Sequence, residues 1–181
     1  MLILKKNFLL PFLQILCLCA FSLNAMAQTR IAILDFELKD MTLAPRLPAE
    51  IHRTAAIKAM LEEELNRAGY KIIAIDAQAQ RHANSGVGYL FDHHDTAAEL
   101  AKKAGADYVL VGRLHKPSFL FAYLMGHLIK VSNHQLIGNY VVETKGGDEK
   151  LTRKAVETFA DTLDADLDNR YTPPAPLTTA H

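Results

Sequence analysis

The stretch Arg30–Phe36, RIAILDF, decides the fold. It is apolar at nearly every position, whereas a strand with one face in water alternates apolar and polar residues. The run therefore predicts a central strand in a sheet that is covered on both faces. Asp35 is the exception, because a buried carboxylate needs a partner, which Arg113 or a helix N-terminus could supply.

The residues after this strand begin a strand–helix–strand unit. Over residues 50–68, Ile57, Leu61 and Leu65 recur at four-residue spacing and give a helix one apolar face. A second short apolar strand is predicted over residues 71–75.

The same pattern is then repeated after a less regular segment. Residues 77–94 have no clear period and predict a loop with a short helical turn. Asp95 or Thr96 can cap a helix that runs to Ala104. Residues 108–112 form the third apolar strand.

The pattern downstream is that of an antiparallel hairpin. Residues 118–131 and 136–143 are apolar or rich in strand-forming residues, and a turn joins them. A helix over 119–130 is the alternative, since Leu, Met and Ala allow one. A last helix is predicted over 149–167 from apolar residues at four-residue spacing.

The predicted order is therefore βαβαβ, a β-hairpin and a C-terminal helix. Parallel strands joined by helices take right-handed crossovers, and the hairpin extends the sheet in antiparallel fashion. The fold class is α/β, in a two- or three-layer sandwich, formed by a single domain over residues 28–170. Residues 171–181 contain three prolines and predict a disordered tail.

Residues 1–27 have the pattern of an export signal. Lys5 and Lys6 give a positive start, residues 8–21 are apolar, and the Ala-Met-Ala at 25–27 is typical of a signal-peptidase site. The apolar run is shorter than a spanning helix needs, so an uncleaved anchor is the less favoured alternative. We expect cleavage after Ala27 and a periplasmic protein with no transmembrane segment.

Charge and cysteine usage narrow the function classes. Lys5 and Lys6 are the only charged residues of the signal, so of 20 basic and 20 acidic residues the exported chain keeps 18 and 20, a net charge of −2. Nucleic acid is not an expected partner, because it requires a basic stripe. Cys17 and Cys19 both lie in the signal, so the exported chain has no disulfide, thiolate metal site or cysteine nucleophile.

The topology predicts one cluster of polar residues. The carboxyl ends of parallel strands share an edge, where ligands tend to bind. The residues expected there are Asp35, Glu37, Asp40, Asp76, Arg113, His115 and Lys116. A ligand or partner surface would use Asp35, Asp76, Arg113 and His115, whereas a structural ion-pair network is the simpler interpretation.

A second cluster contains candidate metal ligands. Imidazole and carboxylate groups suit zinc, copper or nickel, which makes His82, Asp92, His93 and His94 the candidates. Their spacing matches no closed metal site, and adjacent side chains on an extended loop point in opposite directions. A solvated loop whose acids cap the next helix is the alternative.

No motif in the chain identifies a reaction. The sequence has no phosphate-binding loop, no G-x-S-x-G elbow and no H-E-x-x-H pair. The leading hypothesis is a non-enzymatic periplasmic binding or accessory module with an envelope protein partner, bound at the strand edge or the apolar segment 119–125. The alternatives are a metal-handling protein that binds zinc or copper, and a hydrolase using Asp35, Asp76 and His115.

Three segments resemble a family of secreted Gram-negative proteins known as a domain of unknown function. They are RIAILDFELKD (30–40), PAEIHRTAAIKAMLEEELNRAGY (48–70) and AGADYVLVGRLHKPSFLFAYLMGHL (104–128). More distantly, the IAILDF strand, the helix ending in GY, and GADYVLVGRL followed by a hairpin are similar to the amino-terminal domain of the Tol translocation protein and to curli-secretion lipoproteins. The resemblance implies an envelope-associated α/β module that binds partners.

The resemblance carries over no functional residue. The sequence shows neither a lipidated cysteine nor the propeller domain that follows the module in the Tol protein. The pore and Tol functions are therefore not expected to transfer to this chain.

Overall fold

The structure is a computed structural model that describes residues 28–174, so the predicted signal and residues 175–181 of the predicted tail lie outside the described part. The elements, in chain order, are β1 (Arg30–Ile33), β2 (Glu37–Asp40), α2 (Pro48–Arg67), β3 (Lys71–Ile73), α3 (Ala77–Ala83), α4 (Tyr89–Asp92), α5 (His94–Ala104), β4 (Tyr108–Lys116), β5 (Phe121–Lys130), β6 (Gln135–Lys145) and α6 (Glu149–Ala165).

All six strands belong to one sheet, whose order is β3-β1-β4-β5-β6, with β2 also paired to β4. The strands β1 and β2 follow one another along the same edge of β4, and both are parallel to it. On its other side β1 pairs with β3, also in parallel. The long strands β4, β5 and β6 form an antiparallel meander.

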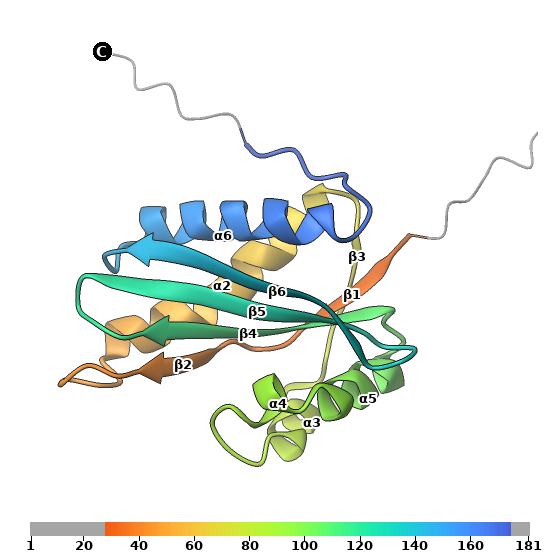
Figure 1. Cartoon of the computed structure of the whole chain (residues 1–181), viewed down its shortest axis with the longest axis horizontal. Coiled ribbons are helices and arrows are strands. Elements are labelled where there is room, and N and C mark those ends of the chain that lie inside the picture. Colours follow the sequence, from red (N-terminus) through yellow and green to blue (C-terminus); the bar gives the residue numbers. More distant parts are fainter. Residues whose placement is uncertain (1–27, 175–181) are drawn as a thin grey trace, which may run out of the picture.

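Helices cover both faces of the sheet, so the molecule has three layers (Figure 1). On one face, α2 contributes Leu61 and α6 contributes Phe159 to a core that includes Leu110 and Leu128 from the strands. On the other face, α4 and α5 pack over the part of the sheet near β1 and the start of β4. The small side chains of α5, such as Ala98, let that helix lie close to the strands.

The fold predicted from the sequence is confirmed in class and in order. Parallel strands joined by helices are followed by an antiparallel hairpin and a C-terminal helix. The alternative helix over 119–130 is wrong, because residues 121–130 form β5, which pairs on both sides. Within the apolar segment, Ala122 and Leu124 are buried in the core, whereas Phe119 and Leu120 are exposed.

Three local predictions differ from the structure. The first strand stops at Ile33 rather than at Phe36, and a further strand, β2, begins at Glu37, where the sequence predicted none. The sequence of β2, ELKD, lacks the apolar pattern of a strand, because pairing with β4 rather than burial holds it. A regular helix, α3, occupies residues 77–83 of the segment without a clear period.

The chain beyond α6 is held by buried polar groups. The carboxylate of Asp164 accepts hydrogen bonds from the Tyr70 hydroxyl and, at 2.8 Å, from the Tyr171 amide. The Tyr171 hydroxyl donates to Glu64 at 2.9 Å. The first residue of the predicted tail is therefore tied to both long helices.

Among the helices within residues 28–174, none is both long enough and apolar enough to cross a membrane.

Candidate functional site

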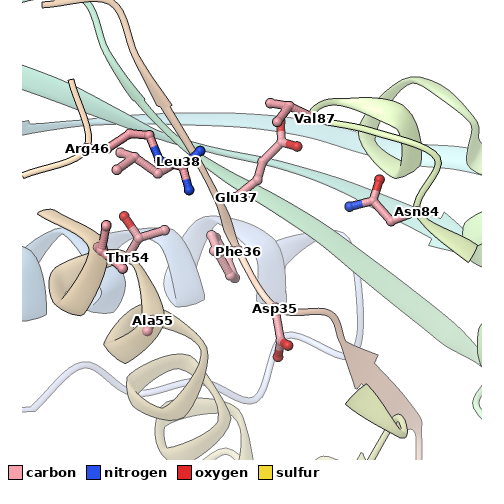
Figure 2. Close-up of a pocket in the computed structure, with 10 residues that line it drawn as sticks. Asp35, Phe36, Glu37, Leu38, Arg46, Thr54, Ala55, Asn84 and Val87 are labelled. Atoms are coloured by element: carbon pink, nitrogen blue, oxygen red, sulfur yellow. The ribbon is translucent and has the colours of Figure 1, made fainter. Parts of the chain in front are cut away.

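A pocket of about 480 Å³ lies beside β2, on the side of that strand that faces away from β4. Its lining comes from four segments: the β1–β2 connection with β2, the loop before α2, the first turns of α2, and the loop after α3 (Figure 2). The lining residues are Asp35, Phe36, Glu37, Leu38, Arg46, Ile51, Thr54, Ala55, Asn84 and Val87. Segments far apart in sequence thus meet at this strand.

The pocket exists because the strand path is interrupted between β1 and β2. The side chain of Gln80, on α3, binds the backbone of Asp35 twice: its oxygen accepts from the Asp35 amide at 3.0 Å, and its nitrogen donates to the Asp35 carbonyl at 3.2 Å. The next residue, Phe36, turns into the core over Gly112 of β4. A side chain at position 112 would overlap the Phe36 ring, so this glycine makes room for it.

One wall of the pocket is fixed by an ion pair. Glu37 of β2 accepts a hydrogen bond from Arg113 of β4 and, at 2.6 Å, from the backbone amide of Gly88. The Arg113 guanidinium lies 4.1 Å from the ring centre of Phe91. These contacts tie the loop after α3, which carries Val87, to the sheet.

The loop before α2, which contributes Arg46 to the lining, is organised by Asp40 at the end of β2. Its carboxylate accepts hydrogen bonds from the amide and hydroxyl of Thr42 and from the Arg46 amide at 3.3 Å. Partial burial works to raise the pKa of Asp40, but these hydrogen bonds outweigh it and leave the pKa below its usual range. Arg46 takes a positive φ of 63°, which is uncommon for a residue other than glycine.

The mouth of the pocket exposes apolar side chains. Val87 is 76% exposed and Ile51 is 44% exposed. In the loop before α2, which contributes Arg46 to the lining, Leu43 and Leu47 are exposed as well. Apolar side chains grouped in this way around a hollow are typical of an interaction site.

The structure does not gather Asp35, Asp76, Arg113 and His115 into one site. The Asp35 carboxylate is largely exposed and pairs with Lys58 at 2.8 Å, whereas Arg113, one of the two partners suggested for it, pairs with Glu37. The cause is the interruption after β1, which releases Asp35 from the strand. Asp76 caps α3 by accepting a hydrogen bond from the Ala79 amide at 2.8 Å.

His115 lies further along β4 than the pocket. It is opposite Lys39 in the register, four strand residues beyond Asp35, which is a separation of about 13 Å. Its buried Nδ1 atom has no hydrogen-bond partner among the described residues. Burial first, and then the charges of Lys39 and Arg113, hold the pKa of His115 below its usual value.

The candidate metal ligands are spread over three helices. His82 lies on α3 and contacts the Gln78 carbonyl, while His93 stacks on Tyr89 with ring centres 4.0 Å apart. Asp92 is exposed at the end of α4. Within residues 28–174 no three His, Cys, Asp or Glu residues form a group that could hold a metal ion.

His94 has a partner that the sequence did not indicate. Its Nε2 atom lies 3.0 Å from Nδ1 of His127 on β5, and the His127 ring also packs on Phe91. Burial, together with the charges of His94 and Arg113, lowers the pKa of His127. His127 stood alone in the sequence, and only strand pairing and the position of α5 bring it to His94.

The comparison with protein families identifies the chain's relatives. Residues 29–163 match the family DUF3280, described as a protein of unknown function (DUF2380). The chain belongs to this family. The family of unknown function expected from the three quoted segments is thereby confirmed, and no curated protein matches the chain in sequence.

Solved structures share the fold. A PelC dodecamer from Paraburkholderia phytofirmans is 16% identical, with a TM-score of 0.50 over 79% of this chain and 89% of that one. Lipoprotein GNA1162 from Neisseria meningitidis is 12% identical, with a TM-score of 0.51 over 76% of this chain and 99% of that one. TolB from Acinetobacter baumannii is 17% identical, with a TM-score of 0.48, over 77% of this chain and 28% of that one.

Proposed function

We propose that this DUF3280 protein is an exported, non-enzymatic module of the cell envelope that binds a protein partner at the pocket beside β2. One observation carries the proposal: a hollow of about 480 Å³ beside a strand that is paired on one side, with exposed apolar side chains at its mouth. Apolar patches around a concave surface are where proteins bind partners.

The charged groups of the pocket favour binding over catalysis. Asp35 is paired with Lys58, and Glu37 is held by Arg113 and the Gly88 amide. Asp40 accepts three hydrogen bonds from its own loop. Each carboxylate therefore has a structural role, whereas a general base must be free to take a proton from a substrate.

Two observations support a location in the envelope. Residues 1–27 have the pattern of an export signal. One of the similar structures, GNA1162, is described as a lipoprotein. We therefore propose a periplasmic location, where the partner is another envelope protein.

The experiment is an affinity pull-down from periplasmic extract that compares the wild-type protein with two variants. Val87→Asp puts a charge at the mouth of the pocket. Leu120→Asp is the matched control, since Leu120 is 77% exposed outside the pocket lining and lies in the apolar segment 119–125, the other surface considered for the partner. We expect one protein to be retained by the wild type and by Leu120→Asp, and to be lost with Val87→Asp. Equal retention by all three baits, loss with Leu120→Asp alone, or no retention by the wild type would refute the proposal.

The same samples test the metal-handling alternative. Zinc and copper bound to the purified protein are measured by mass spectrometry. The observation that favours this alternative is the distance of 3.0 Å between His94 Nε2 and His127 Nδ1. One metal per chain that is lost on His94→Ala, with no protein partner, would replace the present proposal.

A further inference from the structure

The strand β2 uses only one of its two edges. The Met41 amide donates to the Lys116 carbonyl at 2.9 Å, so the backbone amide and carbonyl of residue 41 face β4. Because these groups alternate in direction along a strand, the amides and carbonyls of Leu38 and Asp40 face away from β4. Within residues 28–174 β2 pairs with β4 alone, so the amides and carbonyls of Leu38 and Asp40 have no strand partner.

No neighbouring strand covers this edge in the described part of the chain. The strand β3 pairs with β1 and ends at Ile73, before the level of β2, and the chain then turns into α3. The pocket lies beside β2, where a continuation of β3 past Ile73 would run. The sheet therefore has an unpaired edge at β2, and the backbone groups along this edge can pair with another strand.

The surroundings of this place suit an extended chain with apolar side chains. Phe36 and Leu38 contribute apolar lining from the strand side, and Ile51 and Val87 contribute it from α2 and from the loop after α3. Side chains of an added strand alternate between its two faces, so every second residue would enter the pocket. This is how a strand added to an open sheet edge gains both affinity and specificity.

The charge around the edge favours an acidic residue in the added strand. Arg46 lines the pocket, and Lys39 is exposed on β2. Neither side chain forms an ion pair with a residue of the described chain. The nearby carboxylates are engaged with Lys58, Arg113 and the Thr42 hydroxyl.

We infer that β2 receives an extended segment of the partner protein as an additional strand, paired through Leu38 and Asp40. The segment carries an apolar residue that fills the pocket and a carboxylate that binds Arg46. This inference rests on the proposed function and specifies its chemistry: the partner contributes an acidic, strand-forming stretch rather than a helix or a folded surface.

The test uses linear 12-residue peptides from a phage-displayed library, selected on the full protein purified as the cell produces it. Enriched peptides are made synthetically, and hydrogen exchange is measured at the amides of β2. We expect slower exchange at Leu38 and Asp40 and no change at Lys39, which points towards β4. Methylating alternate backbone nitrogens of the peptide should abolish binding although the side chains are kept.

Variants separate the edge from the rest of the surface. Arg46→Ala should weaken binding of the enriched acidic peptides about tenfold, since a hydrogen bond to a charged group is lost. Leu120→Asp should leave the affinity unchanged. Failure of the library to enrich any peptide, or protection confined to other residues, would overturn the inference.

The outcomes distinguish this inference from the proposed function. A partner retained in the pull-down with no protection of Leu38 and Asp40 refutes strand addition alone. Peptide binding at β2 without any envelope partner refutes the proposed function alone. Self-association of the purified protein that protects the same two amides would assign the edge to a second copy and would also overturn the inference.

Discussion

The strands β1 and β2 lie along the same edge of β4, yet their surroundings differ in almost every respect. Ile31, Ala32 and Ile33 of β1 are completely buried, and that strand is paired on both sides. The strand β2 is paired on one side, carries three charged residues and borders a pocket. Two consecutive strands along one edge of β4, shifted by one residue in register, thus differ in burial and in pairing.

The difference shows how a stable sheet can present an open edge. An exposed strand edge is a hazard, because it can pair with any extended chain. Here β2 is short and charged. It is held to the sheet by Phe36, which packs in the core, and by the ion pair between Glu37 and Arg113. The fully paired β1 supplies stability, so β2 can leave one edge free for binding.

The largest effect is expected when the anchor between the two strands is removed. Phe36 is 8% exposed and packs over Gly112, so Phe36→Ala leaves a cavity in the core. We expect the free energy of unfolding to fall by about 3–4 kcal/mol in urea titrations, as for other buried phenylalanines. Phe119→Ala is the control, since Phe119 is 57% exposed, and it should change stability by less than about 1 kcal/mol.

The partnership of Phe36 and Gly112 can be tested by a double-mutant cycle. Gly112→Ala alone forces a methyl group into the Phe36 ring, whereas the same change beside Phe36→Ala meets an empty space. The two effects should therefore be strongly non-additive. Additive effects would show that Phe36 does not hold β2 through this contact.

A smaller effect is expected from the ion pair that fixes the pocket wall. The side chains of Arg113 and Glu37 are 10% and 20% exposed, so Arg113→Leu leaves a carboxylate partly buried without its cation. We expect a loss of about 2 kcal/mol in urea titrations, and faster exchange of the Gly88 amide. Lys102→Leu breaks the exposed Lys102–Glu99 pair and should cost less than about 0.5 kcal/mol. Similar losses in the two variants would contradict the assigned role of Arg113.

The two hydrogen bonds from the Gln80 side chain to the Asp35 backbone, in the connection between β1 and β2, should contribute less to the free energy of unfolding. Gln80→Ala removes both side-chain hydrogen bonds to the Asp35 backbone, which should lower stability by about 1 kcal/mol and speed exchange of the Asp35 amide. Gln78→Ala on the same helix is the control, because Gln78 is exposed. If the Asp35 amide exchanges at the same rate in both variants, these hydrogen bonds are not what fixes the connection.

The contrast between β1 and β2 also explains what could be predicted from the sequence. The run Ile31–Leu34 is apolar because it is buried on both faces, so its pattern predicts its place in the sheet. The run Glu37–Asp40 is held by backbone pairing to β4, by the Glu37–Arg113 ion pair and by the packing of Leu38, and together these give the run no apolar pattern that indicates a strand. The α/β order was therefore predictable, and β2 was not.

The candidate site was predictable only in part for the same reason. Asp35 and Glu37 were expected at the strand edge because topology places them there. Arg46, Ile51 and Val87 come from loops and the start of a helix, where no periodicity indicates which way a side chain points. The sequence indicated this part of the site only through four apolar residues between Met41 and Ile51, which the structure shows to be exposed.

The smallest expected effect concerns pH and the two strands that carry His115 and His127. Burial, together with nearby positive charges, lowers the pKa of both side chains in the folded protein. At a pH between the lowered values and the ordinary value near 6.5, the unfolded chain binds more protons than the folded one. Stability is therefore complete above pH 6.5 and is lost as the pH falls through this window.

The measurement is the urea midpoint at several pH values between 7.5 and 5. We expect the midpoint to fall on acidification, and to fall less in His127→Gln, because the substituted side chain does not titrate. His52→Gln, at an exposed position on α2, is the matched control and should follow the wild type. A midpoint that stays level in the wild type, or the same slope in His127→Gln, would mean that the fold does not oppose protonation of these imidazoles. Because β1 carries no titratable side chain inside its buried run, the acid sensitivity should appear first as faster amide exchange in β4 and β5 beside α4 and α5, and last in β1.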